Sequence, residues 1–358
     1  MDGLKMDEYL TLENLLKIYE EEIRKNVKNK KKLYYFEKNK MSILTEIYEE
    51  LKSAKFSKIK YNIFYIQEPK YRVVMSLNIK DKIINHFATR YILMPKLEKY
   101  LDMRNVATRK NMGSDYGIKL IKKYMNELKN KNFYILKLDI SKYFYSIDHN
   151  VLKSLIIKVL NEEEYRLICH IIDSSNEDYV YESIKKIQQK GIDVPNYEYK
   201  KGLPIGNMTS QFLSIFFLHK LDHYIVHDLK ILRYVKYMDD MILMYEDKEY
   251  LKLCLEKIKN KIEQEYKLKL NPKKIKIVSC KEGFVFLGYH FKVRNQRLIV
   301  RIRKETKNKI KKNLNRVNYE YRNKKITFEQ YFSSMNNYYY TFKYGSRFNI
   351  QQEINSKL

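Results

Sequence analysis

The chain of 358 residues has no tryptophan, only three cysteines, nine glycines and five prolines. Cys169, Cys254 and Cys280 lie far apart and form no CxxC pair, so the sequence favours neither a zinc site nor a disulfide framework. This cysteine usage fits a reducing compartment, and we predict a cytoplasmic protein. The scarcity of glycine and proline argues against long flexible linkers.

Long apolar segments are also missing. No run of about 18 apolar residues occurs, so no membrane-spanning helix is expected. The first residues, MDGLKMDEYL, carry early acids and no apolar segment, which argues against a signal peptide.

Acidic residues are few relative to basic ones: 43 Asp and Glu stand against 71 Lys and Arg, a net charge of +28. This excess predicts a polyanionic partner, with nucleic acid first and an anionic membrane surface second. The alternative is an AT-rich coding bias, which raises Lys, Asn, Ile and Tyr together. That bias does not explain why the acids fail to rise equally. The 34 Tyr and 16 Phe suit base stacking, although most are expected in the core.

Hydrophobic periodicity divides the chain into helical and strand-rich parts. The pattern predicts charged helices over 1–60, a hairpin over 61–76 with Pro69 near its turn, an apolar strand over 131–144, a loop over 190–210, an apolar helix over 209–228, a helix over 248–266 and a basic helix from about 300. Helices alternate with strands, but hairpins are present too, so an α+β fold fits better than a doubly wound sheet.

The stretch RYVKYMDDMILMYED, residues 233–247, predicts an apolar hairpin with Asp239 and Asp240 at its turn. Asp139 ends the apolar strand that precedes it. Three carboxylates brought together repel one another and demand a cation, and Mg²⁺ prefers such oxygen ligands. Two ions about 3.5–4 Å apart could activate a 3′-hydroxyl and stabilise a pyrophosphate leaving group. A pair of aspartates in a turn is more often structural, but the second Asp-ended strand and the glycine-containing loop favour the metal site.

Seven segments resemble, in the expected order, the motifs of the reverse transcriptases, and of bacterial enzymes related to group II introns and retrons in particular. They are EPKYRVVMSLNIKDKIINH (68–86), NVATRKNMGSDYG (105–117), LDISKYFYSIDH (138–149), GLPIGNMTSQ (202–211), YMDD (237–240), KLNPKKIKI (269–277) and FLGYHF (286–291). The resemblance implies a right-hand polymerase of fingers, palm and thumb with an antiparallel palm sheet. It implies a helical extension over 1–60, fingers and palm over 61–290, and a basic helical thumb over 291–358.

The loop motif GLPIGNMTSQ indicates which group of reverse transcriptases the chain resembles most. Group II intron enzymes usually have Q-G-x-x-x-S-P there, whereas this chain has Ile205 and Gln211 in place of the Gln and the Pro. That version is similar to the reverse transcriptases of diversity-generating retroelements, which copy a template RNA and misincorporate opposite adenines. Two alternatives stay open: a stand-alone phage-defence (antiviral) reverse transcriptase that makes repetitive or untemplated DNA, and a catalytically inactive RNA-binding module.

The resemblance implies roles at the metal site. Asp139 and Asp239 would ligate two Mg²⁺ ions, or Mn²⁺, with Asp240 nearby and less direct and the Ile140 carbonyl as a further ligand. Lys274 would protonate the leaving pyrophosphate, with Lys273 and Lys276 as alternatives.

The resemblance also implies roles around the nucleotide. Phe144 would exclude a 2′-hydroxyl, unless it is a core residue beside Tyr143 and Tyr145. Gly206 would allow close backbone approach, and Ile205 would touch the base pair through apolar contact alone. The remaining substrate-binding candidates are Gln211 and four basic residues that would hold the triphosphate or contact RNA backbone, Lys70, Arg72, Arg109 and Lys110.

The expected reaction is the addition of dNTPs to a 3′ end on an RNA template. The partners are template RNA and an RNA/DNA duplex, together with a structured non-coding RNA and a small accessory protein in the diversity-generating interpretation. The segment 301–325 has eleven basic residues against Glu305 and Glu320, which suits phosphate contacts along a duplex.

Overall fold

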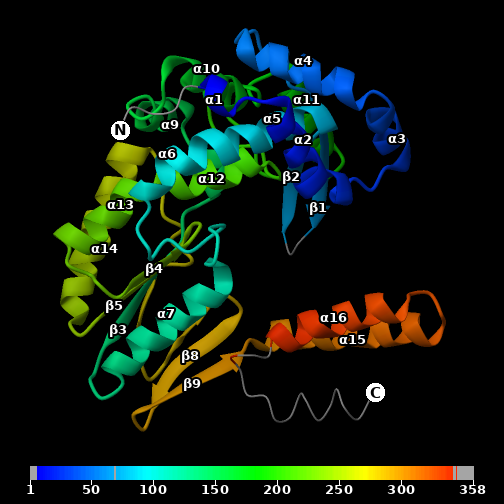
Figure 1. The fold of residues 1–358 in the computed structure, drawn as a ribbon. Coiled ribbons are helices and arrows are strands. Elements are labelled where there is room, and N and C mark those ends of the chain that lie inside the picture. The colour runs from blue at the N-terminus through cyan, green and yellow to red at the C-terminus, as the bar shows by residue number, and fades with distance from the viewer. Residues whose placement is uncertain (1–5, 68–69, 342–343, 345–358) are drawn as a thin grey trace.

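The computed structural model describes residues 6–67, 70–341 and 344. Pro69, which we predict near a hairpin turn, lies outside these residues. The chain forms a helical lobe, a four-stranded sheet below it, and a three-stranded sheet that leads into a helical pair (Figure 1). The predicted α+β class with an antiparallel sheet is confirmed. No helix among the described residues is long and apolar enough to cross a membrane.

Two sets of helices, far apart in sequence, build the helical lobe. The first set comprises α1 (Met6–Tyr9), α2 (Leu12–Ile18), η1 (Tyr19–Ile23), η2 (Arg24–Asn26), α3 (Lys30–Lys38), α4 (Lys40–Lys52), α5 (Ile79–Phe87), η3 (Ala88–Leu93), α6 (Met94–Leu97) and η4 (Glu98–Tyr100). The second set comprises α8 (Tyr143–Ser146), α9 (His149–Ile156), α10 (Glu162–Asp173), α11 (Asp178–Gln189) and α12 (Met208–Phe217). Several of these helices begin at a residue whose side chain caps the first backbone N–H groups. At the start of α10, Asn161 and Glu164 form a reciprocal capping box.

A hairpin of β1 (Tyr61–Gln67) and β2 (Tyr71–Leu77) projects from the helical lobe toward the lower half of the molecule (Figure 1). Its register pairs Tyr61 with Leu77 and Gln67 with Tyr71. The end near the lobe is buried through Tyr61 and Leu77, and Val73 and Met75 of β2 are buried too, whereas the far end of β1 is exposed. The predicted hairpin is therefore present, with its base in the core.

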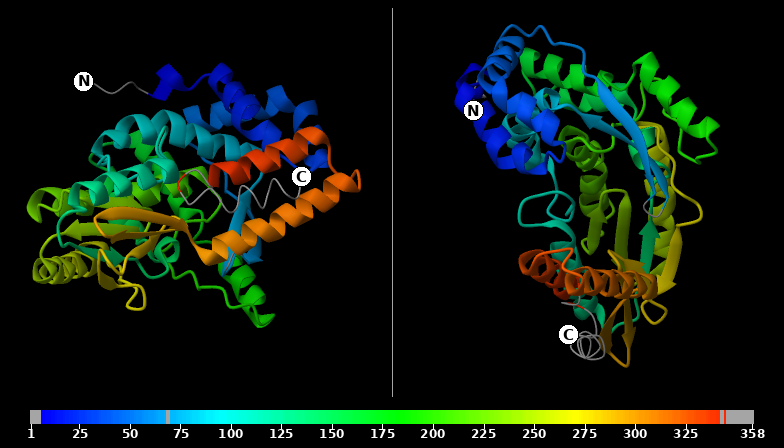
Figure 2. Two further views of the ribbon diagram at one scale, coloured as in Figure 1. Left: turned by 90° about the horizontal axis from the view of Figure 1, so that it is seen from below. Right: turned by 90° about the vertical axis from the view of Figure 1, so that its right-hand side faces the viewer.

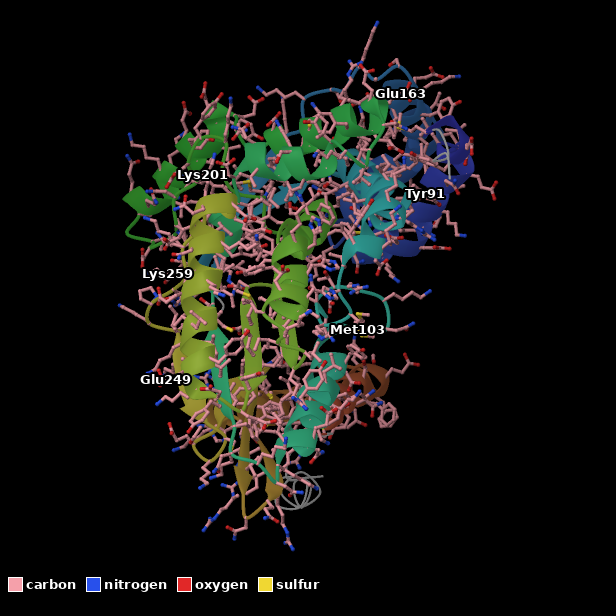
Figure 3. The ribbon with its side chains drawn as sticks, turned by 90° about the vertical axis from the view of Figure 1, so that its left-hand side faces the viewer. Tyr91, Met103, Glu163, Lys201, Glu249 and Lys259 are labelled. Carbon is pink, nitrogen blue, oxygen red and sulfur yellow. The ribbon has the colours of Figure 1, made fainter. Side chains whose placement is uncertain are left out.

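The central sheet is antiparallel and has the strand order β4-β5-β3-β6. Its strands are β3 (Tyr134–Leu138), β4 (Tyr234–Tyr237), β5 (Asp240–Tyr245) and β6 (Lys276–Ser279). The helices α13 (His219–His223), η5 (Tyr224–Asp228) and α14 (Lys248–Tyr266) lie along one face, where Figure 3 shows α14 on the outside. The opposite face packs on α7 (Gly113–Leu128) and on the three-stranded sheet. Alternate strand residues therefore enter two different cores.

The three-stranded sheet comprises β7 (Phe284–Phe286), β8 (Tyr289–Arg294) and β9 (Arg297–Ile302). An antiparallel pair follows, α15 (Lys304–Arg322) and α16 (Phe328–Thr341), which extends away from the sheet (Figure 2). The sequence pattern predicts a basic helix from about 300 and no strand before it, whereas the structure has β9 over Arg297–Ile302 and begins the helix at Lys304. The correction has a physical reason: this segment pairs with β8 along its whole length, and Leu298, Val300 and Ile302 pack on the core beneath.

A buried polar network fastens β4 to the helical layer. The Lys236 ammonium lies 2.7 Å from Asp222 on α13, and both side chains are fully buried. Asp222 also accepts hydrogen bonds from the Tyr234 hydroxyl at 2.8 Å and the Asn105 amide at 3.2 Å. Burial pushes the pKa of Asp222 up and that of Lys236 down, and the contact between them opposes both shifts. Removing either partner would therefore leave the other charge buried and unpaired, at a large cost in folding free energy.

The backbone of Lys236 is held as well. Its N–H donates to the Arg104 carbonyl at 2.9 Å, and its carbonyl accepts from Val106 N–H at 3.0 Å. The segment around Asn105 thus pairs with the outer edge of β4 and covers it.

Replacing Lys236 with methionine should lower the free energy of unfolding by about 3–5 kcal/mol, because it leaves Asp222 buried without its cation. The double variant Lys236→Met/Asp222→Leu removes both charges and should recover part of the loss. Denaturant unfolding followed by circular dichroism measures the difference.

The matched control for this variant is Lys252→Met on α14, which breaks an exposed 2.9 Å pair with Glu249 and should change stability by less than about 1 kcal/mol. If Lys236→Met unfolded at the same denaturant concentration as this control, the network would not stabilise the sheet.

Candidate active site

The three candidate carboxylates meet at one end of the central sheet. Asp239 lies in the turn between β4 and β5, and Asp240 is the first residue of β5, paired with Tyr237. Asp139 follows the last residue of β3, and Leu138 lies opposite Met241 in β5. Because adjacent antiparallel strands end side by side, this register places Asp139 next to Asp240.

Mutual repulsion and burial govern the ionisation of Asp239. Burial raises its pKa to about 6, the nearby carboxylate of Asp139 adds to the rise, and Asp240 adds further. Asp139 itself is only 3% exposed. Carboxylates gathered in a partly desolvated place favour a proton or a cation among them.

Two lysines and an asparagine contact these carboxylates. Lys274 pairs with Asp139, and Lys137 in β3 lies 3.2 Å from Asp240. Burial disfavours the charged Lys274 ammonium, but the hydrogen bond and charge of Asp139 outweigh it and raise its pKa. Asn271 donates its side-chain amide to Asp139 at 3.3 Å and its backbone N–H to the Asp139 carbonyl at 2.8 Å.

Lys137 and Asn271 are not among the site residues expected from the sequence. Lys137 stands two residues before Asp139, so strand alternation puts both on one face, and this signal could have identified it. Of the three lysines considered for proton transfer, Lys274 is the one whose ammonium contacts Asp139. Lys273 and Lys276 line the adjoining basic pocket, whose volume is about 430 Å³.

The donor set fits a divalent cation in chemistry. Among the described residues, no group of three or more His, Cys, Asp or Glu side chains is arranged to hold a metal as it stands. Asp139 and Asp240 instead meet lysine ammonium groups. Carboxylate oxygens that repel one another are nevertheless the ligands that Mg²⁺ prefers. Beside Ile140, Asn271 N–H donates a hydrogen bond to the Asp139 carbonyl, and Ser141 N–H donates one to the Lys269 carbonyl. Neither hydrogen bond uses the Ile140 carbonyl.

Phe144 differs from its neighbours on α8. The Tyr143 hydroxyl donates to the Ser214 carbonyl at 2.5 Å, and the Tyr145 hydroxyl accepts from Val73 N–H at 3.2 Å. Both tyrosines are buried, whereas Phe144 is half-buried. The two tyrosines therefore anchor the turn and leave the ring of Phe144 partly accessible.

The loop before α12 is laid against β2. The Ile205 carbonyl accepts from Met75 N–H at 3.1 Å. Gly206 has φ of +112°, and a Cβ there would lie 3.3 Å from Val74 Cγ1. Ile205 is half-buried, and Gln211 is exposed on the first turn of α12. Glycine is thus favoured at 206 by backbone conformation and by close packing.

The four basic candidates fall into two groups. Lys70, Arg72 and Lys110 are exposed. The Arg109 side chain is only 10% exposed, pairs with Glu98 at 3.2 Å and donates to the Asp102 carbonyl at 2.8 Å. Arg109 thus holds its own loop together, a use that differs from the triphosphate contact expected from the sequence.

Comparison with known proteins gives a family and a set of distant structures. Residues 58–291 match the family described as "Reverse transcriptase (RNA-dependent DNA polymerase)". No curated protein matches the chain.

Among solved structures, the chain is similar to three structures of telomerase from two Candida species. Apo telomerase from Candida tropicalis, truncated from its C-terminal domain, is 16% identical over 66% of this chain and 54% of that chain, with a TM-score of 0.48. Telomerases with the TWJ fragment of telomeric RNA, from Candida albicans and Candida tropicalis, are each 16% identical. They cover 69% and 72% of this chain and 47% and 48% of theirs, with TM-scores of 0.44 and 0.49. The chain thus spans about half the length of these telomerase chains.

The family match takes in the β1–β2 hairpin, the whole central sheet, the loop before α12 and all three carboxylates. It confirms the resemblance at the level of the family and, with it, the expected right-hand polymerase fold. The chain belongs to the reverse transcriptase (RNA-dependent DNA polymerase) family.

Proposed function

We propose that the chain is an RNA-directed DNA polymerase that adds dNTPs to a 3′ end by two-metal nucleotidyl transfer. The observation that carries this proposal is the meeting of Asp139, Asp239 and Asp240 at one sheet end, where burial and the neighbouring carboxylates raise the pKa of Asp239. Mg²⁺, or Mn²⁺, held by these carboxylates and the Ile140 carbonyl would neutralise the charge that develops on the phosphates. Template RNA, an RNA/DNA duplex and dNTPs are the partners.

The chain's own residues supply positioning and a proton. In the reaction the 3′ oxygen bonds to the α-phosphorus and the bond to pyrophosphate breaks. Lys274, with a raised pKa and a half-exposed ammonium beside Asp139, is the group we assign to protonate the leaving pyrophosphate. Exposed Lys70, Arg72 and Lys110 bind the triphosphate, and Arg109 keeps the loop that carries Lys110 in place.

We assign 1–60 to a helical extension, 61–290 to fingers and palm, and 291–358 to the thumb. Within the last part, residues 342–343 and 345–358 lie outside the described residues. The exposed basic side chains of α15 suit contacts with duplex phosphates.

Error-prone copying of the diversity-generating type is our finer proposal. Ile205 is fixed through its carbonyl to β2 and offers an apolar side chain, with no amide to orient a template base. A base held by apolar contact alone is poorly discriminated from a similar one. The phage-defence alternative shares this sequence feature and differs in its product, which would be repetitive or untemplated DNA.

Replacing Asp239 with asparagine should abolish Mg²⁺-dependent primer extension, because a metal-binding carboxylate is lost. It should also raise the thermal midpoint of the metal-free protein at pH 7.5 by a few degrees. The folded-state pKa of about 6 exceeds the ordinary value of 3.8, so ionised Asp239 costs stability as pH rises through this window. The gain should therefore vanish near pH 4.

The control is Asp228→Asn, which changes an exposed aspartate at the end of η5 and should alter neither property. Retained extension by Asp239→Asn would refute the metal assignment. An unchanged thermal midpoint at pH 7.5 would refute the expected cost of burying ionised Asp239 beside the other carboxylates.

Shortening Phe144 to valine should lower discrimination against ribonucleotides by about 10- to 100-fold, because the smaller side chain leaves room for a 2′-hydroxyl. Single-nucleotide incorporation with dNTP and rNTP measures the ratio. Phe144→Tyr keeps an aromatic ring of the same width and should leave the ratio close to that of the wild type. Equal discrimination by Phe144→Val and the wild type would show that Phe144 only fills the core.

Replacing Ile205 with glutamine should lower misincorporation opposite template adenines, because the amide can orient the template strand. Sequencing of cDNA copied from a defined RNA gives the error frequency at each base. Ile205→Val keeps an apolar contact and should leave the error frequency as in the wild type. Unchanged adenine errors in Ile205→Gln would count against this origin of low fidelity.

A further inference from the structure

Helix α3 and the turn before it carry a dense positive surface that the polymerase site does not use. We call the exposed residues Lys28, Lys30, Lys31, Lys32, Tyr34, Tyr35 and Lys38 the α3 patch. Figure 1 shows α3 at the outer end of the helical lobe, and it lies outside the family match over 58–291. Five cations and two aromatic rings thus share one short stretch of surface.

The one acid of α3, Glu37, is half-buried and already paired with cations outside the helix. Glu37 accepts a hydrogen bond from the Tyr19 hydroxyl at 2.7 Å and pairs with Arg24 at 2.8 Å and Lys40 at 3.5 Å. These contacts lower the pKa of Glu37, with the Tyr19 hydrogen bond contributing most. The outer face of α3 therefore presents positive charge without a compensating carboxylate of its own helix.

The helix is held firmly enough to present its tyrosines. Phe36 is 3% exposed and packs on Tyr19 with ring centroids 4.5 Å apart. The Asn29 side chain caps the helix by accepting from Lys32 N–H at 3.0 Å. Among the described residues, Tyr34, Tyr35 and Tyr199 are the large hydrophobic side chains that are two-thirds or more exposed. Two of these three rings are neighbours on α3.

Helix α14 shows what lysine abundance alone produces. Its sequence, KEYLKLCLEKIKNKIEQEY, has five lysines and four glutamates. Two of its lysines pair with acids one turn away, Lys252 with Glu249 and Lys261 with Glu265. Figure 3 shows Glu249 and Lys259 on the same outer surface of this helix. Coding bias raises lysine on both helices, but only α3 separates lysine from acid.

The arrangement favours nucleic acid over a membrane surface. A helix that binds in a bilayer interface turns an aliphatic face outward. On α3 the apolar side chains turn inward instead, since Phe36 is buried and Leu33 is half-buried against the core. Lysines that can reach phosphates beside exposed aromatic rings are the combination that binds single strands, through charge and base stacking.

We propose that the α3 patch binds a single-stranded segment of RNA outside the polymerase centre. The lysines contact successive phosphates, and Tyr34 and Tyr35 stack on unpaired bases. The choice of RNA rests on the proposed function, because the template of that reaction is RNA. The surface would hold a part of the template that is not being copied.

The test measures binding apart from catalysis. A fluorescein-labelled single-stranded RNA of about 12 nucleotides is titrated by fluorescence anisotropy over a range of salt concentrations, with full-length Asp239→Asn protein and no dNTP. Lys30→Ala/Lys31→Ala/Lys32→Ala should reduce the salt slope by about 2, since each phosphate contact on a single strand contributes about 0.7. Tyr34→Ser/Tyr35→Ser should weaken binding about tenfold with an unchanged slope.

The matched control is Lys252→Ala/Lys257→Ala/Lys259→Ala, which removes three exposed lysines of α14 and should leave slope and affinity close to those of the parent. If the α3 variants bound as this control does, the α3 patch would not be an RNA site. A duplex RNA that lost as much affinity as the single strand in the tyrosine variant would overturn the single-strand assignment. Should the lysine variant fail to fold, the tyrosine variant alone decides.

Two further measurements separate the remaining outcomes. Binding to vesicles of phosphatidylcholine and phosphatidylserine that depends on the α3 lysines, with RNA binding unaffected, would assign the patch to a membrane and refute the proposal. Wild-type protein that shows α3-dependent RNA binding but no primer extension would refute the proposed polymerase activity and leave this inference standing.

Discussion

The buried pair of Lys236 and Asp222 is the constraint on which the rest of the site depends. It lies on the helical side of β4, three residues before Asp239, and Tyr234 and Asn105 donate further hydrogen bonds to Asp222. The hairpin tip has to carry carboxylates that repel one another, and a strand held only by its ladder could relieve that repulsion by fraying. An ion pair without solvent contact has no inexpensive way to break, because each partner would be left charged in the core. The buried pair thus holds the hairpin from the helical face of the sheet, which is opposite to the face that carries the candidate site.

The tip itself is a place of balanced charge. Asp139 and Asp240 each meet a lysine, and Asp239 remains the carboxylate whose ionisation burial and repulsion oppose. Lys274 and Lys137 stand where the carboxylates adjoin a pocket lined by further basic groups. A polyphosphate entering such a place competes for the lysines, and a divalent cation competes for the carboxylates. Breaking the two lysine–carboxylate pairs therefore costs less free energy when substrate and cation bind together than when either binds alone.

Local pattern predicted much of this site. The strand ending at Asp139, the hairpin carrying Asp239 and the loop with Gly206 could be placed because alternation and turn chemistry act over a few residues. The contact between Lys137 and Asp240 depends instead on the register between β3 and β5, which are about a hundred residues apart. The pair of Lys236 and Asp222 depends on which helix covers which face. Long-range pairing also decides β9, whose basic residues are typical of the helix that follows.

The sequence gives the net charge directly, but it does not show where on the surface that charge is concentrated. The net excess predicts a polyanion, but a count cannot distinguish lysines balanced by nearby acids from lysines left uncompensated. Folding makes that distinction: on α14, Lys252 and Lys261 pair with glutamates one turn away, whereas the single glutamate of α3, half-buried Glu37, pairs with Arg24 and Lys40 outside the helix. The field felt by a phosphate depends on this local sum, because salt screens charges beyond about 8–10 Å. The separation of Glu37 from the α3 lysines, more than the net charge of +28, is therefore what suits this part of the surface to a polyanion.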